Sequence, residues 1–212
     1  MPYRRLLAWY GAGSKGLVPV LLICSVSLLF ACGGKAEVKP AVLLPDTHPR
    51  ALIKTKFGDI HIKFYPDVAP NHVANFIKLA KAGFYNGTIF HRVIPGFMIQ
   101  GGDPNTQDSL RKDTYGQGGP KDEKGNPIWL KAEFSDIPHK RGVVSMARAS
   151  EPDTAGSQFF IVVEPSHFLD GKYTVFGEVI KGLGVADKIV SVPRSDHDLP
   201  NERIEMTVTI IE

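Results

Sequence analysis

Short segments with strand character fill residues 50–212, and they limit the folds open to this chain more than any other feature. In RALIKTKFGDIHIKFYP, residues 50–66, apolar and polar side chains alternate on both sides of Phe57-Gly58-Asp59. Alternation around a glycine-containing turn predicts a β-hairpin. Further strands are expected at residues 142–147, 157–163, 173–180 and 205–211.

The sequence favours helices in two places. Pro70 and Gly83 mark the two ends of the first predicted helix, within residues 69–87. Apolar residues recur at helical spacing on one face of this segment: Val73, Phe76, Ile77 and Ala80. A second, shorter helix is expected at residues 185–190. A mainly β chain with two helices favours one antiparallel sheet, closed or sandwiched, that the helices cap.

The first 32 residues have the organisation of an export signal. A basic start precedes an apolar stretch, residues 17–31, which is shorter than the roughly 20 apolar residues that a membrane-spanning helix needs. The stretch ends in LFACGG, which resembles the lipobox of bacterial lipoproteins, whose cysteine, here Cys32, is lipidated and becomes the mature N-terminus. This predicts a signal peptide at 1–31, a linker at 33–49 and a domain at 50–212.

The leader also predicts where the protein acts. We expect a lipid anchor on Cys32 that holds the domain in the cell envelope, facing the periplasm or another extracytoplasmic space. An uncleaved N-terminal anchor and ordinary cleaved secretion are the alternatives.

Composition excludes several classes of function for the domain. The only two cysteines, Cys24 and Cys32, lie in the leader, so the domain has no internal disulfide, thiol nucleophile or cysteine metal ligand. The leader holds three of the 25 basic residues and none of the 22 acids, so the rest is formally neutral and carries no basic patch for nucleic acid. Metal-binding histidine spacings, a P-loop and a dinucleotide fingerprint are also missing, so we expect neither metal nor cofactor.

One stretch, FHRVIPGFMIQGGD at residues 90–103, combines a cation, apolar side chains and an amide. A buried strand has no need of Arg92 and Gln100, and an exposed loop has no need of Phe97 and Met98. Such a set suits a reaction that cleaves no bond and needs only a shaped apolar pocket with hydrogen-bond donors beside it.

This stretch resembles the central motif of the cyclophilins, a family of peptidyl-prolyl cis-trans isomerases. GVVSMARASEPDTAGSQFFI, residues 142–161, resembles the second signature of the family, and FLDGKYTVFGEVIKG, residues 168–182, resembles the third. The three blocks occur in the family order, and the resemblance covers residues 50–212. It implies a closed eight-stranded antiparallel barrel capped by two helices, with the substrate groove on its outer face.

The resemblance also implies roles, position by position. Arg92 and Gln100 correspond to catalytic residues. The residues that correspond to the substrate-binding groove are Phe97, Met98, Ala147, Arg148, Phe160, Phe168, Leu169 and Tyr173. Phe168 stands where many eukaryotic members have tryptophan, which implies weaker binding of cyclosporin. Tyr173 replaces a frequent histidine at the groove edge.

The role of Arg92 has a physical basis. Rotation about a peptide bond faces a barrier of roughly 18–20 kcal/mol, because the nitrogen lone pair is delocalised into the carbonyl. Midway through rotation the lone pair is localised on the proline nitrogen and accepts a hydrogen bond. A fixed guanidinium placed there stabilises the twisted state more than either planar state, as catalysis requires.

The other groove residues would hold the substrate. Gln100 and a backbone N–H near Arg148 would hold the peptide on either side of the rotating bond. The expected pocket for the proline ring consists of Phe97, Met98, Phe160 and Leu169. His91 is expected to form hydrogen bonds within the structure rather than to act as a base, because the reaction moves no proton.

Simpler interpretations exist for two of these residues. Taken without the motif, Arg92 would be expected to pair with an acid such as Asp103 or Glu133. Phe160 would be expected in the core. The loop at residues 103–130, of which 103–127 reads as surface, is longer than in compact bacterial cyclophilins. Its charged part, residues 121–127, either contacts partners or is tolerated surface.

We therefore expect a monomeric isomerase of X-Pro bonds that assists the folding of exported proteins, with proline-containing peptides and unfolded clients as partners. The alternative is a proline-peptide binding or scaffold module with incidental turnover. Arg92 favours the enzyme, because binding alone needs only the pocket and the peptide-holding donors. A solute-binding lipoprotein is disfavoured by the single domain.

The lipobox gives a direct prediction. Expressed with its leader in a bacterial host, the mature protein should begin at Cys32 and carry the added mass of a lipid modification, and Cys32→Ser should abolish that mass. Mass spectrometry of the N-terminal peptide makes the measurement. An intact leader without modification would contradict the prediction.

Overall fold

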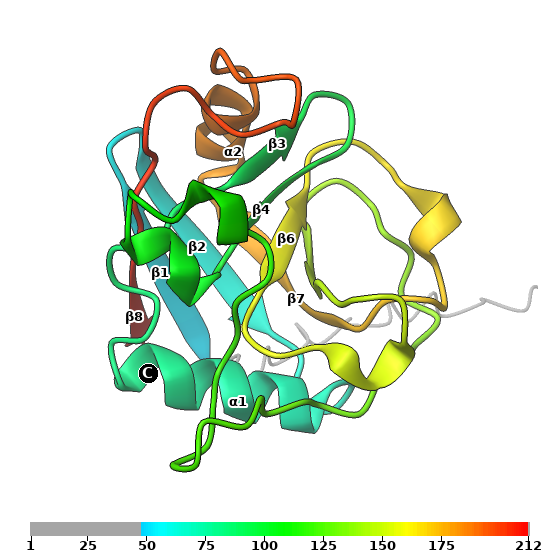
Figure 1. Cartoon of the computed structure of the whole chain (residues 1–212). Helices are drawn as coiled ribbons and strands as arrows, with labels where there is room; N and C mark the ends of the chain where they lie inside the picture. Colours follow the sequence, from blue (N-terminus) through cyan, green and yellow to red (C-terminus); the bar gives the residue numbers. More distant parts are fainter. Residues whose placement is uncertain (1–47, 212) are drawn as a thin grey trace, which may run out of the picture. The chain divides into compact units, whose positions relative to one another are not determined.

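Eight strands form one antiparallel sheet in the order β3-β4-β6-β5-β7-β2-β1-β8. The structure is a computed structural model that describes residues 48–211 (Figure 1). The predicted signal peptide, Cys32 and most of the predicted linker lie outside the described residues. The strands are β1 (Arg50–Thr55), β2 (Gly58–Phe64), β3 (Arg92–Ile94), β4 (Met98–Gly101), β5 (Val143–Met146), β6 (Phe159–Val162), β7 (Val175–Lys181) and β8 (Thr207–Ile211).

Two α-helices, α1 (Pro70–Lys81) and α2 (Leu183–Val190), lie at opposite ends of the curled sheet (Figure 1). Both predicted helices are confirmed, α2 with two more residues at its start. Four short 3-10 helices lie in the loops: η1 (Pro104–Gln107), η2 (Lys112–Thr114), η3 (Pro152–Thr154) and η4 (His167–Leu169). Within residues 48–211, no helix has the length and apolar character needed to cross a membrane.

The predicted hairpin at residues 50–66 is confirmed, but its turn lies before Gly58, because Gly58 and Asp59 already belong to β2. Thr55 of β1 pairs with Gly58 of β2, so Lys56 and Phe57 form the turn. The Thr55 hydroxyl accepts a hydrogen bond from the Phe57 N–H and donates one to the Gly58 carbonyl. Gly58 has a φ of 127°, which side chains rarely permit, so glycine is the residue that this turn requires.

The sheet is open, and the expectation of a closed barrel is wrong. The edge strands β3 and β8 do not pair with each other. The segment before β8 bridges the gap instead. Phe90 N–H donates to the Ile204 carbonyl at 3.1 Å, and Val93 N–H donates to the Asp198 carbonyl at 2.9 Å.

Helix α1 closes the inner face of the sheet with a cluster of aromatic rings. The predicted apolar face is turned inward, since Val73, Phe76 and Ala80 are buried. The Phe76 ring lies 5.2 Å from the ring of Phe64 in β2 and 4.7 Å from that of Tyr85. Such rings bury large apolar areas, so this cluster anchors the helix to the sheet.

The N-terminus of α1 is capped by a residue distant in the sequence. Ala69, at the cap position, has no side chain that can accept a hydrogen bond. Glu133 accepts from the N–H groups of Asn71 and His72, both at 3.1 Å, and from the His72 ring at 2.6 Å. Burial alone would raise the pKa of Glu133, but the hydrogen bonds from His72 and Asn71 hold it below its ordinary value. The ionised carboxylate therefore ties α1 to the segment before β5.

This contact predicts a stability effect. Glu133→Ala should lower the free energy of unfolding by about 1–3 kcal/mol, because the helix loses its cap and the buried His72 ring loses its partner. Urea unfolding followed by circular dichroism makes the measurement, with Glu123→Ala in the exposed loop as the control. An equal unfolding midpoint for the two variants would contradict the capping role.

Candidate active site

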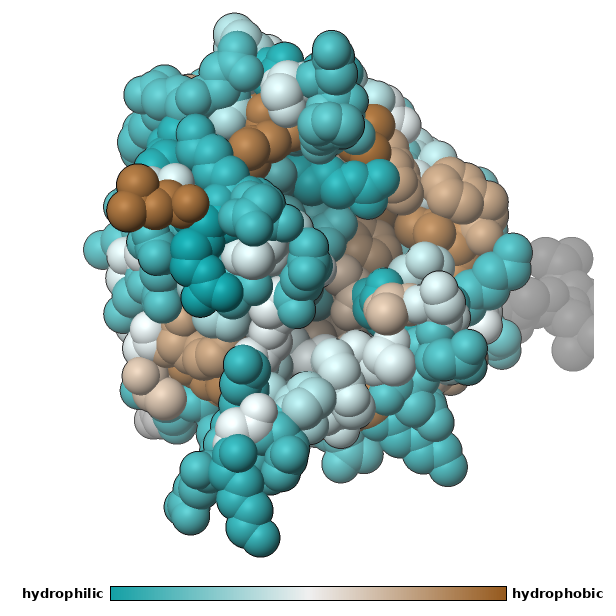
Figure 2. All heavy atoms as spheres, viewed as in Figure 1, coloured by the Kyte–Doolittle hydropathy of each residue, from teal (hydrophilic) through white to brown (hydrophobic). Residues whose placement is uncertain are grey.

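A groove of about 790 Å³ lies on the face of the sheet opposite α1 and the aromatic cluster. All ten residues to which the resemblance gave a role in catalysis or substrate binding line it. Figure 2 shows this side of the molecule hollowed near its centre, with apolar surface in the hollow and hydrophilic side chains along much of its rim.

The strand register brings the key residues into one row. Arg92 of β3 pairs with Gln100 of β4, and Gln100 pairs in turn with Phe160 of β6. Ser145 of β5 pairs with Phe160 on its other side. Residues directly opposite one another in neighbouring strands share a face, so these four side chains lie on the groove side.

The neighbouring positions point the other way. Val93, Ile99 and Ile161 are fully buried in the main core, one on each of β3, β4 and β6. A second apolar cluster, which includes Met98, Phe160 and Leu169, lies under the groove. The three strands therefore serve the core with one set of residues and the groove with the alternate set.

Arg92 is held loosely, with its side chain 45% exposed. Its Nη1 donates to Gln100 Oε1 at 3.5 Å, and its Nε lies 3.9 Å from Asp198 Oδ2. The simpler interpretation, a pair with an acid, is confirmed in part, because the acid is Asp198 and not Asp103 or Glu133. Asp103 accepts hydrogen bonds from the N–H groups of Asn105 and Gly116 instead, and Glu133 caps α1.

The apolar part of the groove is built from rings and two buried aliphatic side chains. Phe160 is buried and packs edge-on against Tyr173, with ring centroids 5.8 Å apart. Phe97 contacts Phe168 at 5.3 Å, and Phe168 remains 63% exposed at the rim. Met98 and Leu169 are buried beneath them. The pocket is therefore apolar at its base and open on the side of Phe168.

The comparisons with known proteins agree with this geometry. Residues 50–211 match the family described as "Cyclophilin type peptidyl-prolyl cis-trans isomerase/CLD". The chain belongs to the cyclophilin family. A "Probable peptidyl-prolyl cis-trans isomerase" of Brucella abortus is 45% identical over 147 residues, 68% of this chain and 72% of that protein. A peptidyl-prolyl cis-trans isomerase of Acinetobacter baylyi is 43% identical over 165 residues, 75% and 81% of the two chains.

A solved structure is also similar. The cyclophilin-type isomerase of Cryptosporidium parvum, crystallised in the presence of the dipeptide Ala-Pro, superimposes with a TM-score of 0.67 at 32% identity. The match covers 77% of this chain and 99% of that one.

Arg148 contributes to this cyclophilin groove in two ways. Its guanidinium lies over the Tyr173 ring, 4.4 Å from the centroid, and donates to the carbonyls of Ala149, Ser150 and Lys172. Its side chain therefore braces the wall of the groove. Among residues 48–211 the backbone N–H of Arg148 has no acceptor, which leaves it available to a peptide.

His91 lines the groove. Neither ring nitrogen has a partner of good hydrogen-bond geometry among the described residues, although the Ile89 backbone and the Gln158 side chain interact with the ring. Burial lowers the pKa of His91, with the negative charge of Asp103 opposing the shift. A neutral, buried ring suits a packing role and not proton transfer.

One wall of the groove was missed by the sequence analysis. It comes from η2 and the residues after it, through Lys112, Tyr115 and Gly116, and from the loop before β8, through Ser195 and His197. The first segment lies in the region expected to be surface loop. Asp103, at the end of the central motif, is fully buried and anchors it through Gly116 N–H. A fully buried aspartate such as Asp103 rarely lacks a partner. The sequence, however, did not indicate that this partner is the N–H of Gly116.

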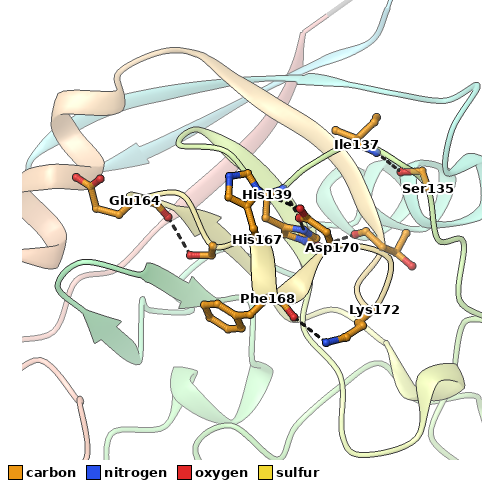
Figure 3. Close-up of polar contacts among 11 residues, drawn as sticks. Ser135, Ile137, His139, Glu164, His167, Phe168, Asp170 and Lys172 are labelled. Atoms are coloured by element: carbon orange, nitrogen blue, oxygen red, sulfur yellow. Dashed lines mark hydrogen bonds and ion pairs between the residues drawn. The ribbon is translucent and has the colours of Figure 1, made fainter. Parts of the chain in front are cut away.

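The rim that carries Phe168 and Leu169 is held by Asp170 (Figure 3). Its carboxylate accepts from His139 N–H at 2.7 Å, from the His139 ring at 3.0 Å and from the His167 ring at 2.9 Å. The His139 ring in turn stacks on Phe160, with centroids 6.1 Å apart. Asp170 thereby connects η4, which forms the rim, to the apolar base of the groove.

These contacts predict a pH dependence. Hydrogen bonds, the largest from His139 N–H, lower the pKa of Asp170 from 3.8 to about 2. A carboxylate with a lowered folded-state pKa stabilises the fold above its unfolded pKa, and this contribution is lost as the pH falls. The wild-type urea midpoint should therefore drop between about pH 4 and pH 2 more steeply than that of Asp170→Asn.

The exposed Asp136 provides the matched control for this measurement. Asp136→Asn should keep the wild-type pH dependence. Parallel curves for wild type and Asp170→Asn would refute the anchoring role.

Proposed function

We propose that this cyclophilin isomerises X-Pro bonds of exported client proteins in the cell envelope. The observation that carries the proposal is the row of Arg92, Gln100 and Phe160 across three paired strands, which places a guanidinium beside an apolar pocket. Membership of the isomerase family supports the reaction. The leader supports the location.

Arg92 is the proposed catalytic group. A proline ring seated against Phe160 and Met98 would place its nitrogen near the guanidinium. As the bond twists, an Nη–H donates to the lone pair that appears on that nitrogen, and the bond returns to either planar form when the contact is released. No proton is transferred, in keeping with the neutral His91.

Two further groups would hold the peptide while the bond rotates. The side-chain amide of Gln100 donates to Gln158 Oε1 at 3.0 Å, and the Gln158 amide donates to the carbonyls of Gly116 and Gly118. This chain of amides fixes Gln100 against the loop wall. The unpaired N–H of Arg148 would bind a peptide carbonyl on the other side of the proline. Holding both ends lets the bond alone move.

The envelope location is supported by the sequence of the domain and of the segments before it. The domain has no cysteine, so an oxidising compartment would not alter it. A linker at 33–49 would let a lipid-anchored domain reach at most about 60 Å from the membrane. Such a reach suits unfolded clients that emerge at the membrane surface.

A binding or scaffold module is the alternative function, and it would use the same pocket. The exposed Phe168 lacks the indole N–H of a tryptophan, so we expect weak cyclosporin binding in either case. The two functions differ in their need for Arg92, because isomerisation requires its guanidinium and binding alone requires only the pocket and the peptide-holding donors.

Arg92→Ala should lower kcat/KM for a short X-Pro peptide about a hundredfold, equal to about 2.7 kcal/mol of transition-state stabilisation, with the fold unchanged. Arg92→Lys should recover only part of the rate, since a lysine is a point charge without the planar fork. A protease-coupled isomerisation assay makes the measurement on residues 33–212.

Lys188→Ala, which removes an exposed cation from α2, is the control and should keep the wild-type rate. A wild-type protein inactive on every X-Pro peptide, but able to bind them, would establish the scaffold function instead.

A further inference from the structure

Asp198 occupies an unusual position in the loop between α2 and β8. Among residues 48–211 it is the one non-glycine residue with a positive φ, 61°. Aspartate tolerates this conformation better than most residues, at some cost in backbone strain. Strain of this kind persists where surrounding contacts impose it, and it is often found beside functional groups.

The contacts of Asp198 converge on the strand that carries Arg92. Its carbonyl accepts the N–H of Val93, the next residue in β3, at 2.9 Å. Its carboxylate lies between two arginines, with Oδ2 3.9 Å from Arg92 Nε and Oδ1 3.3 Å from Arg194 Nε. One residue therefore hydrogen-bonds to the backbone beside Arg92 and places a carboxylate within ion-pair distance of its guanidinium.

The surrounding loop is part of the groove. Ser195 and His197 line the cavity on this side, and the loop passes above β3 in Figure 1. The loop itself is closed by hydrogen bonds from Ser195 N–H to the Leu199 carbonyl and from Asp198 N–H to the Ser195 carbonyl. The carboxylate is thus presented from a defined turn.

We propose that Asp198 is a positioning residue for Arg92, an inference that rests on the proposed catalytic role of that arginine. By engaging Nε, the carboxylate leaves both Nη groups of Arg92 free for Gln100 and for the proline nitrogen. An untethered arginine samples many rotamers, and only some of them aim an N–H at the rotating bond.

The carboxylate also reduces the positive potential at Arg92, which opposes the gain from positioning its guanidinium. The acceptor in the twisted state is a lone pair on a neutral nitrogen, so the direction of the donor matters more than its net charge. The carboxylate and the guanidinium are 31% and 45% exposed, so solvent screens the charge effect further. Positioning therefore dominates.

The test uses two substitutions that both accept a positive φ, Asp198→Asn and Asp198→Gly. Each should lower kcat/KM for an X-Pro peptide by about three- to fivefold, the range of an exposed ion pair, with peptide affinity within about twofold of wild type. In an Arg92→Ala background neither should lower the rate further. Asp187→Asn is the matched control, because it removes a carboxylate on α2 that pairs with Arg141, and it should keep the wild-type rate.

A second measurement does not depend on activity. Nuclear magnetic resonance relaxation of the Arg92 Nε–H should show greater motion in Asp198→Gly than in wild type. Unchanged motion with a wild-type rate would overturn the inference, as would an equal loss of rate in the Arg92→Ala background. If Arg92→Ala alone kept full activity while Asp198→Gly loosened its side chain, the proposed function of Arg92 would fail and the positioning contact would stand.

Discussion

The pairing register of β3, β4, β6 and β5 is the constraint on which both faces of this protein depend. Arg92, Gln100, Phe160 and Ser145 align on one face, and the residues between them fill the core on the other. A slip of one residue between any two of these strands would bury polar groove residues and expose apolar ones. The stability of the core therefore selects the register that also assembles the groove, and the site needs no separate scaffold.

Three carboxylates supplement this sheet by fastening irregular segments to it. Asp103 holds the loop around Gly116, Glu133 holds the start of α1, and Asp170 holds η4. Each accepts a backbone N–H, and the strength of such charge-assisted hydrogen bonds exceeds that of neutral ones. In a domain without cysteines, these contacts connect distant parts of the chain as disulfides do in many exported proteins.

Local patterns predicted the hairpin and α1 well, because alternation and helical spacing are properties of neighbouring residues. The groove residues followed from the family motifs and not from periodicity. What escaped prediction depends on contacts distant in the sequence: the open edge beside the three-residue β3, the groove wall at Lys112 and Tyr115, and the pairing of Arg92 with Asp198. A histidine in a motif suggests hydrogen bonding, yet only the packing around His91 reveals that its ring nitrogens lack a partner of good geometry within residues 48–211.

The open sheet also has a consequence for solubility. An exposed strand edge is a template on which other chains can add a strand and aggregate. The outward N–H of Val93 on β3 is already occupied by the carbonyl of Asp198. The loop before β8 therefore shields the edge of the strand that carries the groove arginine, so this edge is not open to the addition of another strand.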